Sequence, residues 1–163
     1  MTSKVKIYLD TSVINFLFAD DAPEKKEITI DFFENFIKTS IYETCISDFV
    51  IAEIEDTPRE EKKRLLLDVV KHYPIEFVEV NRDEVVSLAG KYIDAKIIPQ
   101  KKVMDAYHIA VCVLNQINYL VSWNYKHLAN INKEQKIRQV NIANNYFHEL
   151  RIITPLELIN DES

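Results

Sequence analysis

The sequence predicts an α/β fold, in which a mostly parallel central sheet of four to five strands is covered by helices on both faces. Three observations support this fold class. Short apolar runs rich in β-branched and aromatic residues alternate with longer segments in which apolar residues recur at helical spacing. Helical segments separate nearly every pair of strand segments, which is the order typical of parallel sheets. The 163 residues suit one domain and are few for two, so we expect a single domain over 1–163.

Each element follows from its local pattern. The first strand, Val5 to Leu9, alternates in its apolar residues and stops at Asp10. Similar short runs predict strands at 42–46, 76–80, 119–122 and 151–153. Helical spacing, capping residues and prolines predict helices at 11–18, 23–38, 47–55, 58–73, 82–95, 103–115 and 134–147. Residues 97–102 are expected to form a loop, Pro155 to start a terminal turn, and residues 160–163 to form a frayed tail.

The composition, 47% apolar and 28% charged, is that of a globular protein. No apolar run approaches the roughly 20 residues that span a bilayer, and the N-terminus lacks the pattern of a signal peptide. We therefore expect a cytoplasmic protein without a membrane association. Cys45 and Cys112 both lie among apolar residues, which favours buried thiols in a reducing compartment over a disulfide or a metal role.

Charge and glycine content limit the kinds of ligand site. The net charge of −6 argues against a protein that coats nucleic acid by nonspecific attraction, although an enzyme that meets nucleic acid through a metal ion and a local basic patch remains compatible. Gly90 is the only glycine. Phosphate-cradling loops and dinucleotide fingerprints need several glycines, so both are excluded and side chains must hold any ligand.

Four polar residues follow strands or open helices in the predicted fold. Asp10 ends the first strand, Glu53 lies in the helix after the second, Asp105 opens an apolar helix, and Asn124 follows the fourth strand. A parallel sheet gathers such positions at one edge. Taken singly, Asp105 could be a helix cap and Glu53 a solvated helix acid. Together the four predict a site at the carboxyl edge of the sheet.

Four segments of the chain resemble the successive motifs of PIN domains. They are Leu9-Asp10-Thr11-Ser12-Val13, the segment from Ser47 to Ile54, Met104-Asp105-Ala106-Tyr107-His108-Ile109-Ala110, and Leu120-Val121-Ser122-Trp123-Asn124. The resemblance covers essentially the whole chain, from Val5 to about Leu158. PIN domains are metal-dependent ribonucleases, many of them toxins of bacterial and archaeal toxin–antitoxin modules, and the pattern is similar to the VapC-like toxin type. The resemblance implies a PIN-like three-layer α/β/α fold.

The resemblance also implies a function. Asp10, Glu53 and Asp105 would bind one or two Mg²⁺ or Mn²⁺ ions and, together with Asn124, would be the catalytic residues of an endoribonuclease that hydrolyses RNA phosphodiester bonds. Mg²⁺ prefers oxygen ligands and is usually held by one or two carboxylates plus substrate phosphate, which agrees with these residue types. No separate organic cofactor is expected. An antitoxin protein and a second copy of the chain, in a homodimer, are the partners that the family resemblance suggests.

The fourth position departs from the family pattern, because many members carry an aspartate where this chain has Asn124. An amide oxygen can coordinate a metal ion but brings no negative charge. The alternative is therefore a catalytically weak or inactive PIN-like module that binds RNA or protein. A phosphatase with Asp10 as nucleophile is a weaker alternative, because the haloacid-dehalogenase type needs an aspartate two residues later, at Ser12.

Several neighbouring residues are candidates for supporting roles. Thr11, Ser12 and Ser122 offer hydroxyls beside the acids, although each also suits a cap or a turn. Lys126 and His127 are candidates for substrate binding, weighed against an ordinary surface position. The pattern favours a packed or paired role for His108 and a core position for Trp123, which could otherwise stack on a base.

Overall fold

The computed structural model describes residues 4–124 and 131–161. Its centre is one sheet of five parallel strands in the order β3-β2-β1-β4-β5, which confirms the predicted fold class. The strands are β1 (Lys6–Leu9), β2 (Glu43–Ile46), β3 (Ile75–Phe77), β4 (Tyr119–Val121) and β5 (Arg151–Ile153). Because all five strands run the same way, their carboxyl ends meet at a single edge.

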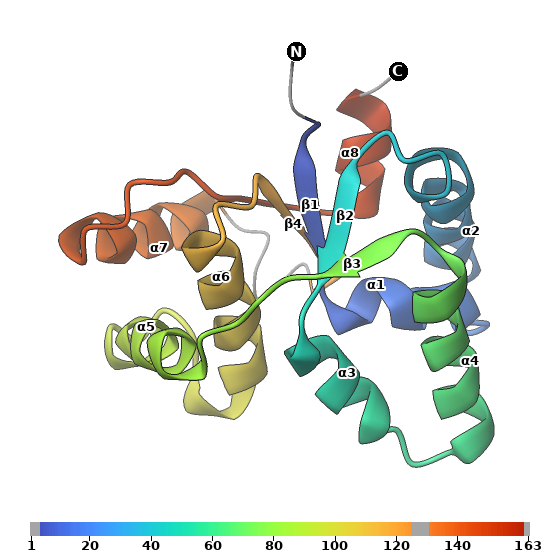
Figure 1. Ribbon diagram of the computed structural model, residues 1–163, viewed down its shortest axis with the longest axis horizontal. Helices are drawn as coiled ribbons and strands as arrows, with labels where there is room; N and C mark the ends of the chain where they lie inside the picture. The colour runs from blue at the N-terminus through green and yellow to red at the C-terminus, as the bar shows by residue number, and fades with distance from the viewer. Residues whose placement is uncertain (1–3, 125–130, 162–163) are drawn as a thin grey trace.

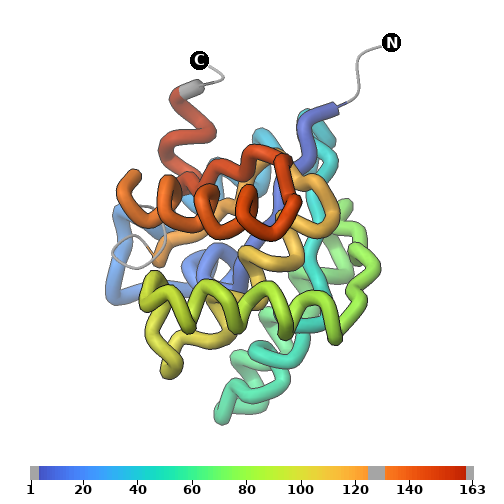
Figure 2. Tube along the Cα trace, turned by 90° about the vertical axis from the view of Figure 1, so that its left-hand side faces the viewer, coloured from blue at the N-terminus to red at the C-terminus, as the bar shows by residue number. Residues whose placement is uncertain are grey.

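Helices cover both faces of the sheet. They are α1 (Thr11–Asn15), α2 (Pro23–Phe32), α3 (Asp48–Glu55), α4 (Glu60–His72), α5 (Arg82–Asp94), α6 (Val103–Leu114), α7 (Ile131–Ala143) and α8 (Pro155–Asp161). Figure 1 shows α5, α6 and α7 on one side of the sheet and α2, α4 and α8 on the other. It also shows α1 and α3 starting where β1 and β2 end. Figure 2 views the molecule from the α5–α7 side, where α5 and α7 both lie across it.

The core is built on the central strand. Ile7, Tyr8 and Leu9 of β1 are fully buried, since helices cover both faces of the sheet at this strand. On the other side of the sheet from α2, helix α6 contributes a nearly continuous buried segment from Ala106 to Val113. Cys45 and Cys112 are both free and buried, as the sequence predicts.

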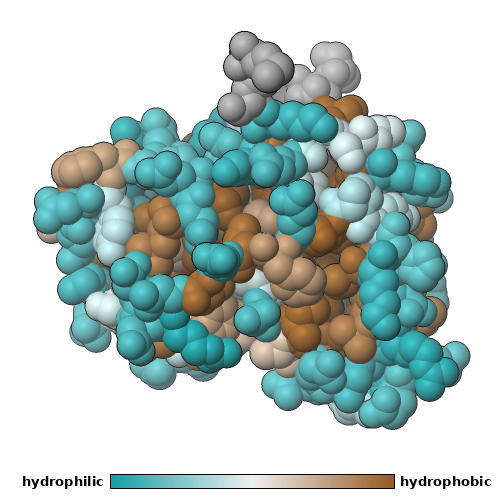
Figure 3. Space-filling model, in the orientation of Figure 1, coloured by the Kyte–Doolittle hydropathy of each residue, from teal (hydrophilic) through white to brown (hydrophobic). Residues whose placement is uncertain are grey.

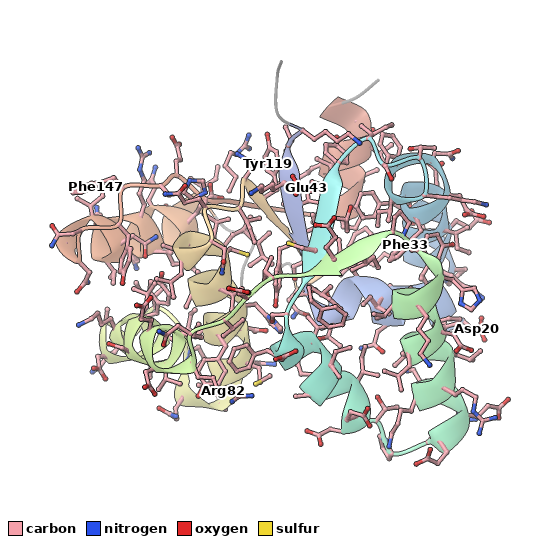
Figure 4. The ribbon with its side chains drawn as sticks, in the orientation of Figure 1. Asp20, Phe33, Glu43, Arg82, Tyr119 and Phe147 are labelled. Carbon is pink, nitrogen blue, oxygen red and sulfur yellow. The ribbon has the colours of Figure 1, made fainter. Side chains whose placement is uncertain are left out.

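Buried and exposed aromatic residues mark the core and the surface of the molecule. Phe33, labelled in Figure 4, is buried, and its ring packs edge-on against Tyr73 with 5.0 Å between ring centroids. Phe147, at the far end of the molecule in the same view, is 73% exposed. Hydrophilic residues dominate the periphery in Figure 3, with apolar residues showing in the middle of that face. No helix in residues 4–124 or 131–161 is long and apolar enough to cross a membrane.

Three predicted boundaries need correction. Strand β3 runs from Ile75 to Phe77 rather than over 76–80. Helix α7 ends at Ala143 rather than at 147, because Asn145 adopts a left-handed φ of 67° and the Tyr146 N–H bonds the Asn141 carbonyl at 2.8 Å, as in a Schellman cap. Helix α8 extends to Asp161, so the first two residues of the predicted frayed tail are helical.

Two other segments differ in detail from the predicted elements. The predicted helix over 23–38 is α-helical only to Phe32 and continues as a π-helical turn from Phe33 to Ile37. The predicted loop over 97–102 ends in a 3₁₀ turn, Gln100–Lys102, that leads directly into α6. That turn delivers Asp105 to the first turn of α6, near the carboxyl edge of the sheet.

The N-cap of α5 provides a test of local stability. Asn81 caps α5, because its Oδ1 accepts the Glu84 N–H at 3.2 Å. Asn81→Ala leaves that N–H without its cap, so we expect the free energy of unfolding to fall by about 1 kcal/mol. Urea denaturation measures this loss. Asn81→Ser, which restores a capping oxygen, is the control and should recover most of the stability.

Candidate active site

Asp10 lies at the carboxyl end of the central strand. Its backbone N–H bonds the Val121 carbonyl at 3.2 Å, which continues the pairing of β1 with β4. Asp10 is the N-cap residue of α1, yet its side chain makes no capping hydrogen bond. Only 1% of the residue is exposed to solvent. The carboxylate is therefore not explained by helix capping and is turned to other partners.

Two serines hold the Asp10 carboxylate in place. The Ser12 hydroxyl donates to Oδ1 and the Ser122 hydroxyl donates to Oδ2, each at 2.5 Å. Both serine oxygens also accept backbone N–H groups at 2.9 Å, Ser12 from Trp123 and Ser122 from Asn124. The hydroxyl hydrogens are thereby directed at Asp10, and both predicted supporting serines contact the predicted acid.

Asp105 and Asn124 complete a cluster with Asp10. The Asn124 Nδ2 lies 3.4 Å from Asp10 Oδ2 and 3.5 Å from Asp105 Oδ1, so one amide group reaches both carboxylates. Asp105 is itself buried in the first turn of α6. Burial raises the pKa of Asp10 to about 6, and the charge of Asp105 adds to this, against the opposing effects of His108 and the two serines. The charge of Asp105 thus disfavours the ionised form of Asp10.

Glu53 lies beside this cluster but has other partners. Its Oε1 accepts hydrogen bonds from the Thr11 hydroxyl and from His108 Nε2, both at 2.6 Å. Burial by itself would raise the pKa of Glu53, but the hydrogen bonds that it accepts from His108 and Thr11 lower it. Glu53 is therefore ionised at neutral pH and is held by α1 and α6, while its side chain stays 31% exposed.

Comparison with known proteins identifies the family. The profile of the PIN domain matches residues 7–134. The chain belongs to the PIN domain family. Two solved structures are similar to it, FitAcB from Neisseria gonorrhoeae (13% identity, TM-score 0.54) and VapBC2 from Rickettsia felis bound to a DNA fragment from their promoter (14% identity, TM-score 0.53). Each alignment covers 92% of this chain and 98% of the other, so both share its fold. No curated protein matches the sequence.

PIN domains are generally nucleases that use divalent metals, so the donor set of this PIN domain can be compared with that chemistry. Among the residues that the structure describes, no three His, Cys, Asp or Glu side chains are close enough together to hold a metal ion. Two buried carboxylates and an amide do come together, at Asp10, Asp105 and Asn124. Mg²⁺ is commonly held by one or two carboxylates while it keeps several waters, so this donor set fits it.

Of the predicted site residues of this PIN domain, the structure brings Asp10, Asp105 and Asn124 together, with Ser12 and Ser122 bonded to Asp10. Thr11 contacts Glu53 rather than Asp10, and Lys126 and His127 lie outside the described residues. Trp123 is buried, as the sequence favours, and its indole N–H donates to the Thr29 hydroxyl at 2.9 Å. His108 is buried and paired, as the sequence favours, but its partners Tyr8 and Glu53 were not predicted. Tyr8 was not singled out, because it lies in an apolar, alternating strand where burial is the ordinary explanation for a tyrosine.

Two basic side chains of this PIN domain lie over aromatic rings. The Lys25 ammonium lies 5.6 Å from the ring centroid of Phe16 and 5.5 Å from that of Trp123. The Arg82 guanidinium, labelled in Figure 4, lies 5.1 Å from the ring centroid of Phe49. Neither residue was singled out in the sequence, because lysines and arginines on a helix surface carry no distinguishing pattern.

Proposed function

We propose that this PIN domain is an endoribonuclease that depends on Mg²⁺ or Mn²⁺ and hydrolyses RNA phosphodiester bonds. The observation that supports it most is the pair of buried carboxylates, Asp10 and Asp105, both within reach of the Asn124 amide. Carboxylate and amide oxygens are donors of the kind that Mg²⁺ takes in proteins. Their meeting at the carboxyl edge of a parallel sheet, where α/β proteins place their ligands, supports a metal-dependent reaction.

In this proposal each residue has a defined role. Asp10 and Asp105 would hold the ion, and the Asn124 amide lies within reach of both. Glu53, which forms no three-carboxylate group with them in the described residues, is proposed as a further carboxylate of the site. Ser12 and Ser122 fix the orientation of Asp10 through their two hydrogen bonds at 2.5 Å. When bound, the ion lowers the pKa of a water molecule and stabilises the leaving oxygen of the scissile phosphodiester. Lys126 and His127 are proposed to contact the substrate strand.

The partners of the proposed function follow from the family. The motifs resemble the VapC-like toxin type, and VapBC2 from Rickettsia felis shares the fold of this chain. We infer that the protein is the toxin of a toxin–antitoxin module, with an antitoxin protein as its partner and a homodimer as its assembly. A small reading frame beside the gene, encoding a DNA-binding protein, would support this inference.

Removing one carboxylate of the pair tests the mechanism. Asp105→Asn keeps the side-chain volume and removes the charge, so we expect RNA cleavage in Mn²⁺ to fall at least about tenfold. Cleavage is measured on labelled RNA with Mn²⁺ and again with EDTA, which should abolish it. Asp94→Asn, an exposed acid at the end of α5, is the matched control and should cleave like the wild type. Undiminished cleavage by the Asp105 variant would refute the assigned mechanism.

The second candidate function is a PIN-like module that binds RNA or protein but cleaves weakly or not at all. Two observations favour it. Asn124 brings no charge to the site, and Glu53 is engaged by His108 and Thr11 at 2.6 Å. Calorimetric titration with Mn²⁺ separates the candidates. Micromolar binding that disappears in Asp10→Asn would count against a module without metal, and its absence would favour that module.

A further inference from the structure

A continuous chain of hydrogen bonds leads from the start of α3 to Glu53. The Ser47 hydroxyl lies 2.6 Å from the Tyr8 hydroxyl, which lies 2.7 Å from His108 Nδ1. His108 Nε2 lies 2.6 Å from Glu53 Oε1. Ser47, Tyr8 and His108 are buried, with 0%, 0% and 1% of their surface exposed. The chain thus joins β1, α3 and α6 out of contact with solvent.

The ends of this chain fix the direction of its hydrogens. The Ser47 oxygen accepts the Phe49 N–H at 3.3 Å, and an ionised Glu53 carboxylate can only accept. His108 Nε2 must therefore donate to Glu53. In a neutral imidazole Nδ1 then accepts, so Tyr8 donates to it and Ser47 donates to Tyr8. Each hydrogen is used once, and the neutral Nε2–H tautomer of His108 satisfies every group in the chain.

We propose that His108 is a positioning residue for Glu53. Held by Tyr8 in the Nε2–H tautomer, it fixes Glu53 Oε1 and thereby the orientation of the carboxylate. Thr11 donates to the same Oε1, so neither bond engages Oε2. This inference rests on the proposed function. His108 itself contacts no reacting atom in this scheme.

The arrangement resembles the support that metal-binding sites give their ligands. Groups behind a ligand orient it, and their loss typically reduces metal affinity 10- to 100-fold. In the commoner arrangement a carboxylate orients a histidine ligand. Here the roles are exchanged, because the histidine orients the proposed carboxylate ligand.

The first experiment reads the tautomer directly. Protein labelled with ¹⁵N at histidine is studied by NMR in EDTA at pH 8, and His108→Gln identifies the His108 signals among the four histidines. We expect a neutral ring protonated on Nε2 in the wild type. Tyr8→Phe removes the hydroxyl that donates to Nδ1, so the ring should become a mixture of tautomers. A wild-type ring protonated on Nδ1 would overturn the proposal whether or not the protein cleaves RNA.

The second experiment measures Mn²⁺ binding by calorimetry on the intact chain. The Gln amide can replace His Nε2 as donor to Glu53, whereas the shorter Asn reaches the position of Nδ1 and cannot. We expect His108→Gln to bind Mn²⁺ within about threefold of the wild type and His108→Asn to lose at least about tenfold. Thermal unfolding in EDTA shows that both variants are folded and compares the stability that each has lost.

The outcomes separate the positioning role from the proposed function. Equal losses of affinity in the two variants, or wild-type affinity in both, would show that His108 only packs. A wild type that binds no Mn²⁺ would instead overturn the proposed metal-dependent function, and the positioning role with it. Loss in His108→Asn with retention in His108→Gln supports both.

Discussion

Asp10→Asn is expected to stabilise the metal-free protein while it abolishes cleavage. The buried carboxylate has a pKa of about 6, against an ordinary value of 3.8. Ionising it inside the protein therefore costs free energy that the unfolded chain does not pay. Asparagine has nearly the same volume and never ionises. We expect the free energy of unfolding at pH 8 in EDTA to rise by about 1 to 3 kcal/mol.

The pH dependence of this effect has a definite sign. A carboxyl group whose pKa is raised on folding contributes its stability below pH 3.8, and this contribution is lost as the pH rises through about 6. The wild type should therefore lose stability across this window relative to Asp10→Asn. At pH 4 the two proteins should differ much less, because Asp10 is then protonated in the folded protein and only about half ionised in the unfolded chain.

Urea denaturation at pH 4 and pH 8, in EDTA, measures the free energy of unfolding of both proteins. Cleavage of labelled RNA in Mn²⁺ by Asp10→Asn is expected to fall at least about 100-fold. Asp94→Asn, at the exposed end of α5, is the control and should change neither quantity. A variant that is less stable than the wild type at pH 8 would show that the serine hydrogen bonds to the charged form outweigh its burial. Opposite changes in stability and activity would mark a residue kept for function.

The periodic segments could be predicted because their burial depends on local pattern. An alternating run that stops at Asp10 is enough to place a strand and an acid at its end, since the side-chain period of a strand is fixed. Boundaries that depend on a single backbone angle were harder to place. The left-handed conformation of Asn145 ends α7 at Ala143, and no glycine at that position indicates the helix end in the sequence.

The sequence could place the candidate residues at one edge of the sheet, but it could not predict their hydrogen-bond partners. Asp10, Asp105 and Asn124 meet because strand order and helix starts bring them to one edge. The partner of Glu53 depends instead on how α3 packs against α6, where residues 55 positions apart come within 2.6 Å. Nothing in the local sequence of either helix encodes that contact. Helix packing therefore decides which acid faces the pair and which is held by a histidine.

Asn124→Asp is expected to raise the affinity for Mn²⁺ and to lower the stability of the metal-free protein. The amide nitrogen now lies 3.4 Å from Asp10 and 3.5 Å from Asp105 and can donate to both. A carboxylate at this position would remove these donors and add a third negative charge beside the buried Asp10 and Asp105. We expect the free energy of unfolding in EDTA at pH 8 to fall by about 1 to 2 kcal/mol.

The same third charge should favour a divalent cation. A carboxylate brings a full negative charge to Mn²⁺ where the amide brings only a dipole, so the affinity is expected to rise about tenfold, which corresponds to about 1.4 kcal/mol. Calorimetry with Mn²⁺ measures it, and RNA cleavage at limiting Mn²⁺ should increase in parallel. Asn124→Ala is the matched control, because it removes the amide without adding charge and should lose stability without gaining affinity.

The comparison of the two variants bears directly on where the ion binds. If Asn124→Asp and Asn124→Ala have the same affinity for Mn²⁺, the cation does not lie between Asp10 and Asp105. If only the aspartate variant gains affinity, the amide in the native chain holds the place of a missing ligand. The native site would then have lower metal affinity and higher stability than the aspartate variant, because the Asn124 amide relieves the repulsion between the acids that a bound cation would otherwise relieve.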